Sequence, residues 1–181
     1  MATAKTGSFY LTESITLGAG TASGTMTQGE LDLGAYVNVP TGQAIAIESV
    51  DFIYQTATFA GDIGIMLSAN GCISASLTDL NPGTALVRAD DQSLIASSTL
   101  NIDKANQVGT HVSALYPANF GPASLSEAFM VVNDTLYLNA GPSGADIGTE
   151  TYVTARVRCR VVKLSNKDWM AIAIQSTAAD N

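Results

Sequence analysis

The sequence predicts an all-β protein built as an antiparallel sandwich, and three observations lead to this fold class. Short segments in which apolar and polar residues alternate recur along the 181 residues, and this period of two is typical of strands with one buried face. Turn-forming pairs such as Asn70-Gly71 and Asn133-Asp134 separate these segments. Residues at helical spacing appear only near the C-terminus, so little helix is expected.

The N-terminal half opens with the clearest strand signal. Phe9, Leu11, Ile15 and Leu17 alternate with hydroxyl-bearing and other polar residues, which predicts a strand with one buried face. A Gly/Ala/Thr/Ser stretch follows at residues 18–24, and its composition is typical of a flexible linker that could let the first strand reach a neighbouring subunit. The predicted strands of this half cover residues 9–17, 25–33, 36–39, 44–55, 63–69 and 72–78.

The segment 44–55 carries a change of phase. Ile45 and Ile47 share one parity, whereas Val50 and Phe52 share the other. One extra residue moves the buried set to the opposite face of a strand. We therefore expect a β-bulge near residues 48–49.

The C-terminal half continues with short strands and ends in a helix. Hairpins are expected where Asn70-Gly71 and Asn133-Asp134 lie between strands. Ser165 and Asp168 match a capping box and predict a helix over residues 166–175. Residues 100–123 are the least regular. The predicted strands of this half cover residues 84–88, 93–97, 111–115, 129–132, 135–139 and 150–164.

The long connections between these strands favour a single jelly roll of about eight strands over a simple meander. An immunoglobulin-like sandwich is the second choice, but its usual Cys-Trp-Cys order is missing because Trp169 follows both Cys72 and Cys159. The length fits one domain over residues 1–181. Residues 1–7 and 176–181 are expected to be flexible tails.

Charge and hydropathy exclude several classes of protein. The net charge of −8 and the pI of about 4.3 argue against sequence-specific or general nucleic-acid binding, which needs a basic surface. No signal peptide and no transmembrane segment is evident in the sequence. Two cysteines, Cys72 and Cys159, give no disulfide framework. They are expected to be small buried residues, although pairing between them stays open.

An arginine row is the sharpest local feature. Arg156, Arg158 and Arg160 alternate with apolar residues, so a strand places all three guanidinium groups on one face. Three interpretations are open: a face paired with the protein's own acids, a contact between subunits, or a contact with phosphate headgroups. Trp169 is expected to anchor the terminal helix or to contribute to a recognition surface. These four residues are our candidates for a subunit interface.

Catalytic, metal and cofactor sites are not predicted. His111 is the one histidine of the sequence, whereas a jelly-roll metalloenzyme needs a histidine cluster. No Gly-x-Ser-x-Gly elbow supports a catalytic triad. His111 is therefore expected in a loop or an interface. Asp90-Asp91 lacks the spacing of a calcium loop, and no glycine loop for phosphates is found.

The closing segment resembles a known family. Residues 135–138, the strand through 160–165 and the residues Asp168-Trp169 resemble the end of the single jelly-roll major capsid proteins of tailless icosahedral, membrane-containing viruses. The resemblance implies upright subunits in pseudo-hexameric capsomers and a non-catalytic function. It also implies copies of the chain as partners, with a second coat protein and an underlying membrane as further ones. The N-terminus departs from RNA-packaging coats because it lacks a basic arm.

We therefore predict a non-enzymatic virion protein, made in the host cytoplasm, that assembles into an icosahedral shell. Low charge and many small residues allow large areas to be buried with few ions to desolvate. The alternative is a carbohydrate- or surface-binding sandwich of the lectin or adhesin type, for which exposed aromatic residues would be needed.

Overall fold

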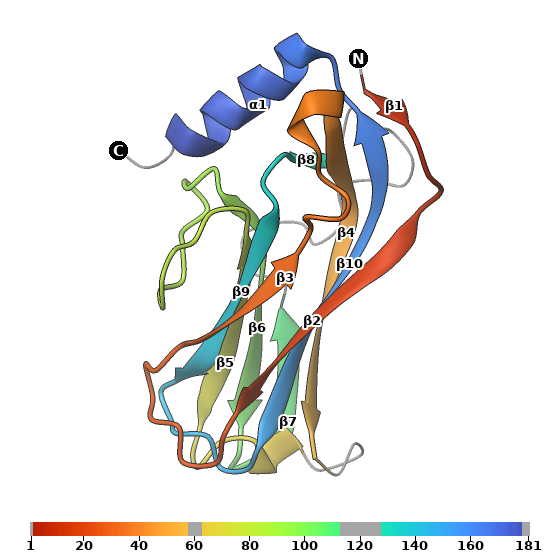
Figure 1. Ribbon diagram of the computed structural model, residues 1–181. Helices are drawn as coiled ribbons and strands as arrows, with labels where there is room; N and C mark the ends of the chain where they lie inside the picture. The colour runs from red at the N-terminus through yellow and green to blue at the C-terminus, as the bar shows by residue number, and fades with distance from the viewer. Residues whose placement is uncertain (1, 58–62, 113–127, 179–181) are drawn as a thin grey trace.

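A computed structural model of the chain describes residues 2–57, 63–112 and 128–178. Figure 1 shows two β-sheets facing each other, with one helix lying across one end. The strands are β1 (Thr3–Ala4), β2 (Phe9–Leu17), β3 (Thr27–Asp32), β4 (Gln43–Thr56), β5 (Gly71–Thr78), β6 (Leu94–Asp103), β7 (Val108–Val112), β8 (Phe129–Val131), β9 (Thr135–Ser143) and β10 (Thr151–Lys163). The helices are the two 3₁₀ turns η1 (Val39–Thr41) and η2 (Ile63–Ile65) and the α-helix α1 (Asn166–Ala178).

The strand order defines the fold. In the first sheet β10 lies between β2 and β4, β8 follows β4, and β1 pairs with the far end of β10. The second sheet has the order β3-β9-β5-β6-β7, and all pairs are antiparallel. Without β1 and β7, eight strands remain. In chain order they form sheets 1-8-3-6 and 2-7-4-5, which is the wiring of a jelly roll. The predicted fold class, with its C-terminal helix, is confirmed.

Two apolar clusters hold the chain together. The larger one fills the space between the sheets with alternate residues of the strands, such as Ile45, Ile73 and Leu138, all fully buried. The smaller one lies on the outer side of the first sheet, where Trp169 and Ile172 of α1 pack against Ala46 and its neighbours. Burial of alternating side chains thus builds the sandwich, and a patch of small residues receives the helix.

The predicted bulge is present in β4. Arg158 of β10 lies opposite Ser49, but the next residue, Cys159, lies opposite Ile47, so Glu48 is the extra residue. Ile47 and Val50 on either side of it both point into the main core. The bulge therefore lets one strand keep its apolar residues inside although their spacing changes by one.

Three predicted strands are wrong, at 36–39, 63–69 and 84–88, and in the first two the cause is local turn chemistry. Residues 36–39 lead into the 3₁₀ turn η1, in which the Asn38 side chain accepts a hydrogen bond from the amide of Thr41. Pro40 in this turn cannot donate to a ladder. Residues 63–69 contain η2 and a single bridge between Leu67 and Ile147 instead of a strand.

Neither predicted hairpin forms. Asn70-Gly71 leads into β5, whose partners are β6 and β9. Asn133-Asp134 joins β8 in the first sheet to β9 in the second, so this turn crosses between sheets. The helix begins as expected, because the Asp168 amide donates to the Ser165 hydroxyl at 3.2 Å.

A long loop covers part of the outer face of the second sheet. Residues 84–88, predicted as a strand, belong to this loop between β5 and β6. Asn139 donates to the carbonyl of Ala85 at 3.3 Å, and Gln28 donates to that of Gly83 at 2.7 Å. The next predicted strand, 93–97, extends to Asp103. The strand expected at 111–115 is β7, which ends at Val112, and its remainder lies outside the described residues.

Two of the three segments predicted as flexible, 18–24 and 1–7, make backbone hydrogen bonds to the sandwich. Of the third, 176–181, residues 176–178 continue α1, and the rest lies outside the described residues. In the linker 18–24, the Gly20 amide donates to Ile147 and the Gly24 amide donates to Pro142. Near the N-terminus, the amide of Lys5 donates to Val161 and the hydroxyl of Thr6 accepts from the same residue. The N-terminal segment thus extends the edge of the first sheet along β10, beside the start of β2 (Figure 1).

Candidate subunit interface

The arginine row lies on the outer face of the first sheet. In β10, Val157 and Cys159 are fully buried in the core, and Arg156, Arg158 and Arg160 point the other way because strand side chains alternate. The same face of β2 exposes Tyr10. The strand therefore presents the three cations as the sequence predicts.

Glu48 holds two of the three arginines. The Arg158 Nε lies 3.0 Å from the Glu48 Oε2, and Arg160 contacts the Glu48 Oε1 through its guanidinium group. The Ser8 hydroxyl donates to the same carboxylate, at 2.9 and 3.1 Å from its two oxygens. The Glu48 side chain is 6% exposed, against 42% for Arg158 and 20% for Arg160. The bulge thus turns an internal carboxylate toward the arginines and the N-terminal segment.

Arg156 has a different environment. Its guanidinium carbon lies 4.1 Å from the centre of the Tyr10 ring, a cation–π contact on an exposed face. Within the described part of the chain, no carboxylate lies within ion-pair distance of Arg156. Its cross-strand neighbours are Thr12 and Asp51. Arg156 is therefore the member of the row whose charge stays available at the surface.

Trp169 lies between α1 and the sandwich. Its ring packs on the smaller apolar cluster, and its indole nitrogen is buried without a hydrogen-bond partner. An open depression of about 410 Å³ adjoins it, lined by Gly34, Val37, Val39, Val132, Asn133 and Asp134. The helix also leaves Met170 and Ile174 about 60% exposed. Anchoring of the helix by Trp169 is thus seen directly, and a recognition role stays a prediction.

His111 lies in the edge strand β7, not in a loop. Its Nε2 is 2.6 Å from the Ser98 hydroxyl, and its ring meets the Tyr54 ring edge-on at 5.7 Å. A serine beside an imidazole is the pairing used for nucleophilic catalysis. However, Ser98 is 1% exposed, so a substrate cannot reach its hydroxyl. The contact joins the strands at this open side of the sandwich.

Metal-ligand geometry is not found in the residues that the structure describes: no group of three or more His, Cys, Asp or Glu side chains converges there. The Asp91 carboxylate instead accepts from the Ser93 amide at 2.9 Å. Likewise, no described helix is long and apolar enough to cross a bilayer. Cys72 and Cys159 are both free thiols, and they lie in different sheets.

One unusual side chain escapes sequence analysis. Asp79, after β5, is 3% exposed, and its Oδ1 has no hydrogen-bond partner. Burial raises its pKa to about 6, and repulsion from Asp91 adds to this effect. In the sequence, Asp79 precedes the turn Asn81-Pro82-Gly83, where an exposed aspartate is normal. No signal in the sequence distinguishes it from such a residue.

Comparisons with known proteins find likeness in structure alone. No family model matches the chain, and no curated protein matches its sequence. The fold is similar to that of polyomavirus VP1 proteins. The unassembled pentamer of Merkel cell polyomavirus VP1 is 10% identical, with a TM-score of 0.42, covering 86% of this chain and 96% of the other.

Two further structures show the same degree of likeness. Merkel cell polyomavirus VP1 in complex with GD1a oligosaccharide is 12% identical, with a TM-score of 0.41 over 89% of this chain and 98% of the other. Trichodysplasia spinulosa-associated polyomavirus VP1, in complex with sialylated glycooligomers, is 10% identical, with a TM-score of 0.38 over 86% and 95%.

Proposed function

We propose that this chain is a structural subunit of a virion shell and assembles with copies of itself. The observation that carries the proposal is the outer face of the first sheet beyond α1, which presents Tyr10, Arg156 and the half-exposed Arg158 to solvent. A sandwich face that combines an aromatic ring with arginines has the composition of an interface centre.

The fold and the sequence narrow the alternatives. Jelly rolls serve as viral coats, as lectins and as cupin-type metalloenzymes. The last class needs several histidines, and the sequence contains one. The inaccessible Ser98 hydroxyl disfavours hydrolysis at the Ser98–His111 pair. A coat subunit is the use that also accounts for low charge and for exposed apolar residues on α1.

The resemblance of residues 135–169 to the major capsid proteins of membrane-containing viruses supports a more specific version of this proposal. In that form the shell is icosahedral and lies over a membrane, with the arginine row and Trp169 in contacts between subunits. A second coat protein and the membrane surface are then additional partners, and the protein is located in the virion.

The test is the mass of the purified protein in solution. Light scattering over a range of salt and protein concentrations, followed by electron microscopy of the largest fraction, is expected to show rings, sheets or shells. A strict monomer under all these conditions, also after addition of any co-encoded coat protein, would overturn the proposal.

One observation favours glycan binding as a second candidate. A shallow depression of about 290 Å³ on the first sheet is lined by Ser14, Gln55, Ala57, Tyr152 and Thr154. Hydroxyl and amide groups beside an aromatic ring suit a sugar. Binding on a glycan array that is lost in Tyr152→Ala, and kept in Tyr10→Ala, would support this candidate. Equal binding by both variants would refute the site.

A further inference from the structure

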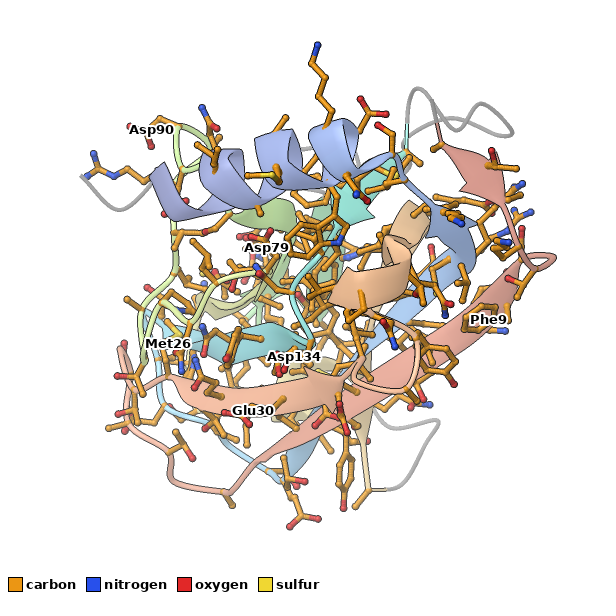
Figure 2. All side chains as sticks on the ribbon, turned by 45° about the horizontal axis from the view of Figure 1, so that its top comes forward. Phe9, Met26, Glu30, Asp79, Asp90 and Asp134 are labelled. Atoms are coloured by element: carbon orange, nitrogen blue, oxygen red, sulfur yellow. The ribbon has the colours of Figure 1, made fainter. Side chains whose placement is uncertain are left out.

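Positive charge is concentrated along one face of an acidic protein. Of the eight Lys and Arg residues, Arg156, Arg158 and Arg160 lie together on the outer face of β10. We name these three residues the basic band. Nitrogen atoms gather beside β1 and β10 in Figure 2. Glu48 and Asp51 lie on the same face, so three positive and two negative charges leave the band at +1.

Negative charge lies on the other side of the sandwich. Glu30 and Asp32 alternate in β3 with the buried Leu31, so they point outward from the second sheet. Asp134 adjoins them, because its carbonyl accepts from the Leu33 amide at 2.7 Å. Figure 2 shows Glu30 and Asp134 together beside β3. We name Glu30, Asp32 and Asp134 the acidic band.

The acidic band has no neutralising partner of its own. All three residues are exposed, and across the described ranges no Lys or Arg nitrogen lies within ion-pair distance of them. Asp32 accepts from the Gly34 amide, and Asp134 accepts from the Thr135 hydroxyl. These local hydrogen bonds orient the two carboxylates and do not neutralise their negative charge.

We infer that the acidic band of one copy docks on the basic band of the next copy. This inference rests on the proposed function and specifies which surfaces meet. The bands lie on the outward faces of opposite sheets, so a contact between them is heterologous and leaves one free band at each end of the pair. Repetition of such a contact closes into a ring or continues as a filament. Contact between two like bands is opposed by repulsion.

Charge also selects a second copy over other acidic partners. The net charge of −8 repels a nucleic acid, which carries a charge at every phosphate, more strongly than it repels a second copy, whose charges are spread over a folded surface. The basic band is modest, since Glu48 already neutralises part of it. A small patch of three carboxylates matches it in size, whereas a polyanion would need a larger basic surface. The partner named by these observations is another molecule of this chain.

The experiment is a charge-reversal exchange. Arg156→Glu alters the exposed arginine that Glu48 does not hold, and Glu30→Lys with Asp32→Lys reverses the acidic band. Each variant alone is expected to need about tenfold or more protein to associate, as measured by light scattering. An equimolar mixture is expected to co-assemble, because each variant then offers a complementary band to the other.

Control variants distinguish the effect of where a charge is reversed from the effect of changing the net charge of the protein. Arg88→Glu, and Asp90→Lys combined with Asp91→Lys, make the same changes in charge in the loop between β5 and β6 and are expected to associate like the wild type. Arg156→Gln is expected to be intermediate. Circular dichroism and the melting temperature show that each variant is folded.

The outcomes distinguish the two proposals. Wild-type protein that stays monomeric overturns the proposed function and the inference with it. Wild-type assembly that is unaffected by either reversal overturns the inference and leaves the coat function standing. Loss of assembly in the single variants without recovery in the mixture also overturns it, because it shows that the two bands do not meet.

Discussion

Glu48 is the residue on which the outer face of the first sheet depends. It accepts hydrogen bonds from Ser8 and Arg160 and forms an ion pair with Arg158, and its removal leaves two neighbouring cations without a counter-charge. We expect Glu48→Gln to lower the free energy of unfolding by about 2 kcal/mol, since hydrogen bonds to charged groups contribute at this level. Both arginines are partly solvated, which limits the loss.

Urea unfolding measures this effect, and Asp51→Asn is the matched control. Asp51 lies on the same strand and the same face but is exposed. A loss for Glu48→Gln no greater than for Asp51→Asn would contradict the role given to Glu48.

Asp79 makes stability depend on pH. Its pKa of about 6 in the folded protein exceeds the ordinary value of 3.8, so between these values the folded state keeps a proton that the unfolded state has lost. The contribution of Asp79 to stability is therefore full below about pH 4 and is lost as the pH rises through 6. A difference of about 2 pKa units corresponds to about 3 kcal/mol.

The substitution Asp79→Asn removes the buried charge and should remove the destabilisation that it causes. This variant should be more stable than the wild type above pH 6 and should lose the pH dependence between pH 4 and 7, as measured by urea unfolding at several pH values. Asp90→Asn, in the exposed loop, should keep it. An unchanged pH profile in Asp79→Asn would show that another group titrates.

At the scale of elements, the junction between η1 and β4 depends on Gly42. Its φ of +68° is a left-handed conformation, and an added Cβ would lie 2.6 Å from the carbonyl oxygen of Leu164. The Gly42 carbonyl also accepts from the Leu164 amide just before α1. We expect Gly42→Ala to cost about 2 kcal/mol through backbone strain and steric overlap.

The melting temperature of this variant is compared with that of Gly7→Ala, in which the added Cβ would have no atom within 4 Å. Similar melting temperatures for the two variants would mean that the junction adapts without cost.

The strands that could be predicted are those whose burial follows their own alternation. Residues 9–17 and 150–164 carry their pattern in sequence, and β2 and β10 match them within a residue. The bulge was equally visible, because Ile47 and Val50 change parity across it. The predictions that fail concern segments whose structure depends on distant parts of the chain. Asn133-Asp134 has the composition of a hairpin turn, but the strands on either side of it belong to different sheets.

The arginines of the candidate site could be predicted from the sequence, but the carboxylate of Glu48 that pairs with two of them could not. Arginines at every second position predict that their side chains share one face of a strand in any fold. The partner Glu48 is more than 100 positions away in sequence, and only the jelly-roll order brings β4 beside β10. Asp79 was missed for a similar reason, since nothing local shows that packing of distant segments will bury it.

At the scale of the whole molecule, the two thiols should report on global unfolding. Cys159 is fully buried, and burial, together with the nearby Glu48 carboxylate, raises its pKa to about 12. Cys72 is half-buried near the start of β5. In native protein we expect a thiol reagent to modify Cys72 first and Cys159 only at the rate of unfolding.

Mass spectrometry of peptides after timed labelling checks this order, and Cys72→Ala isolates the slow site. Rapid labelling of Cys159 in folded protein would show that β10 separates from the sheet without unfolding of the whole sandwich.

The bulge at Glu48 also has a consequence for the natural history of the chain. Since Ile47 and Val50 already point inward on either side of it, a homologue that lacks residue 48 would regain a regular ladder and keep every core contact. It would lose the one acid that compensates Arg158 and Arg160. An alignment of relatives should therefore show a one-residue gap here together with neutral residues at positions 158 and 160, a coordinated gain or loss of three sites.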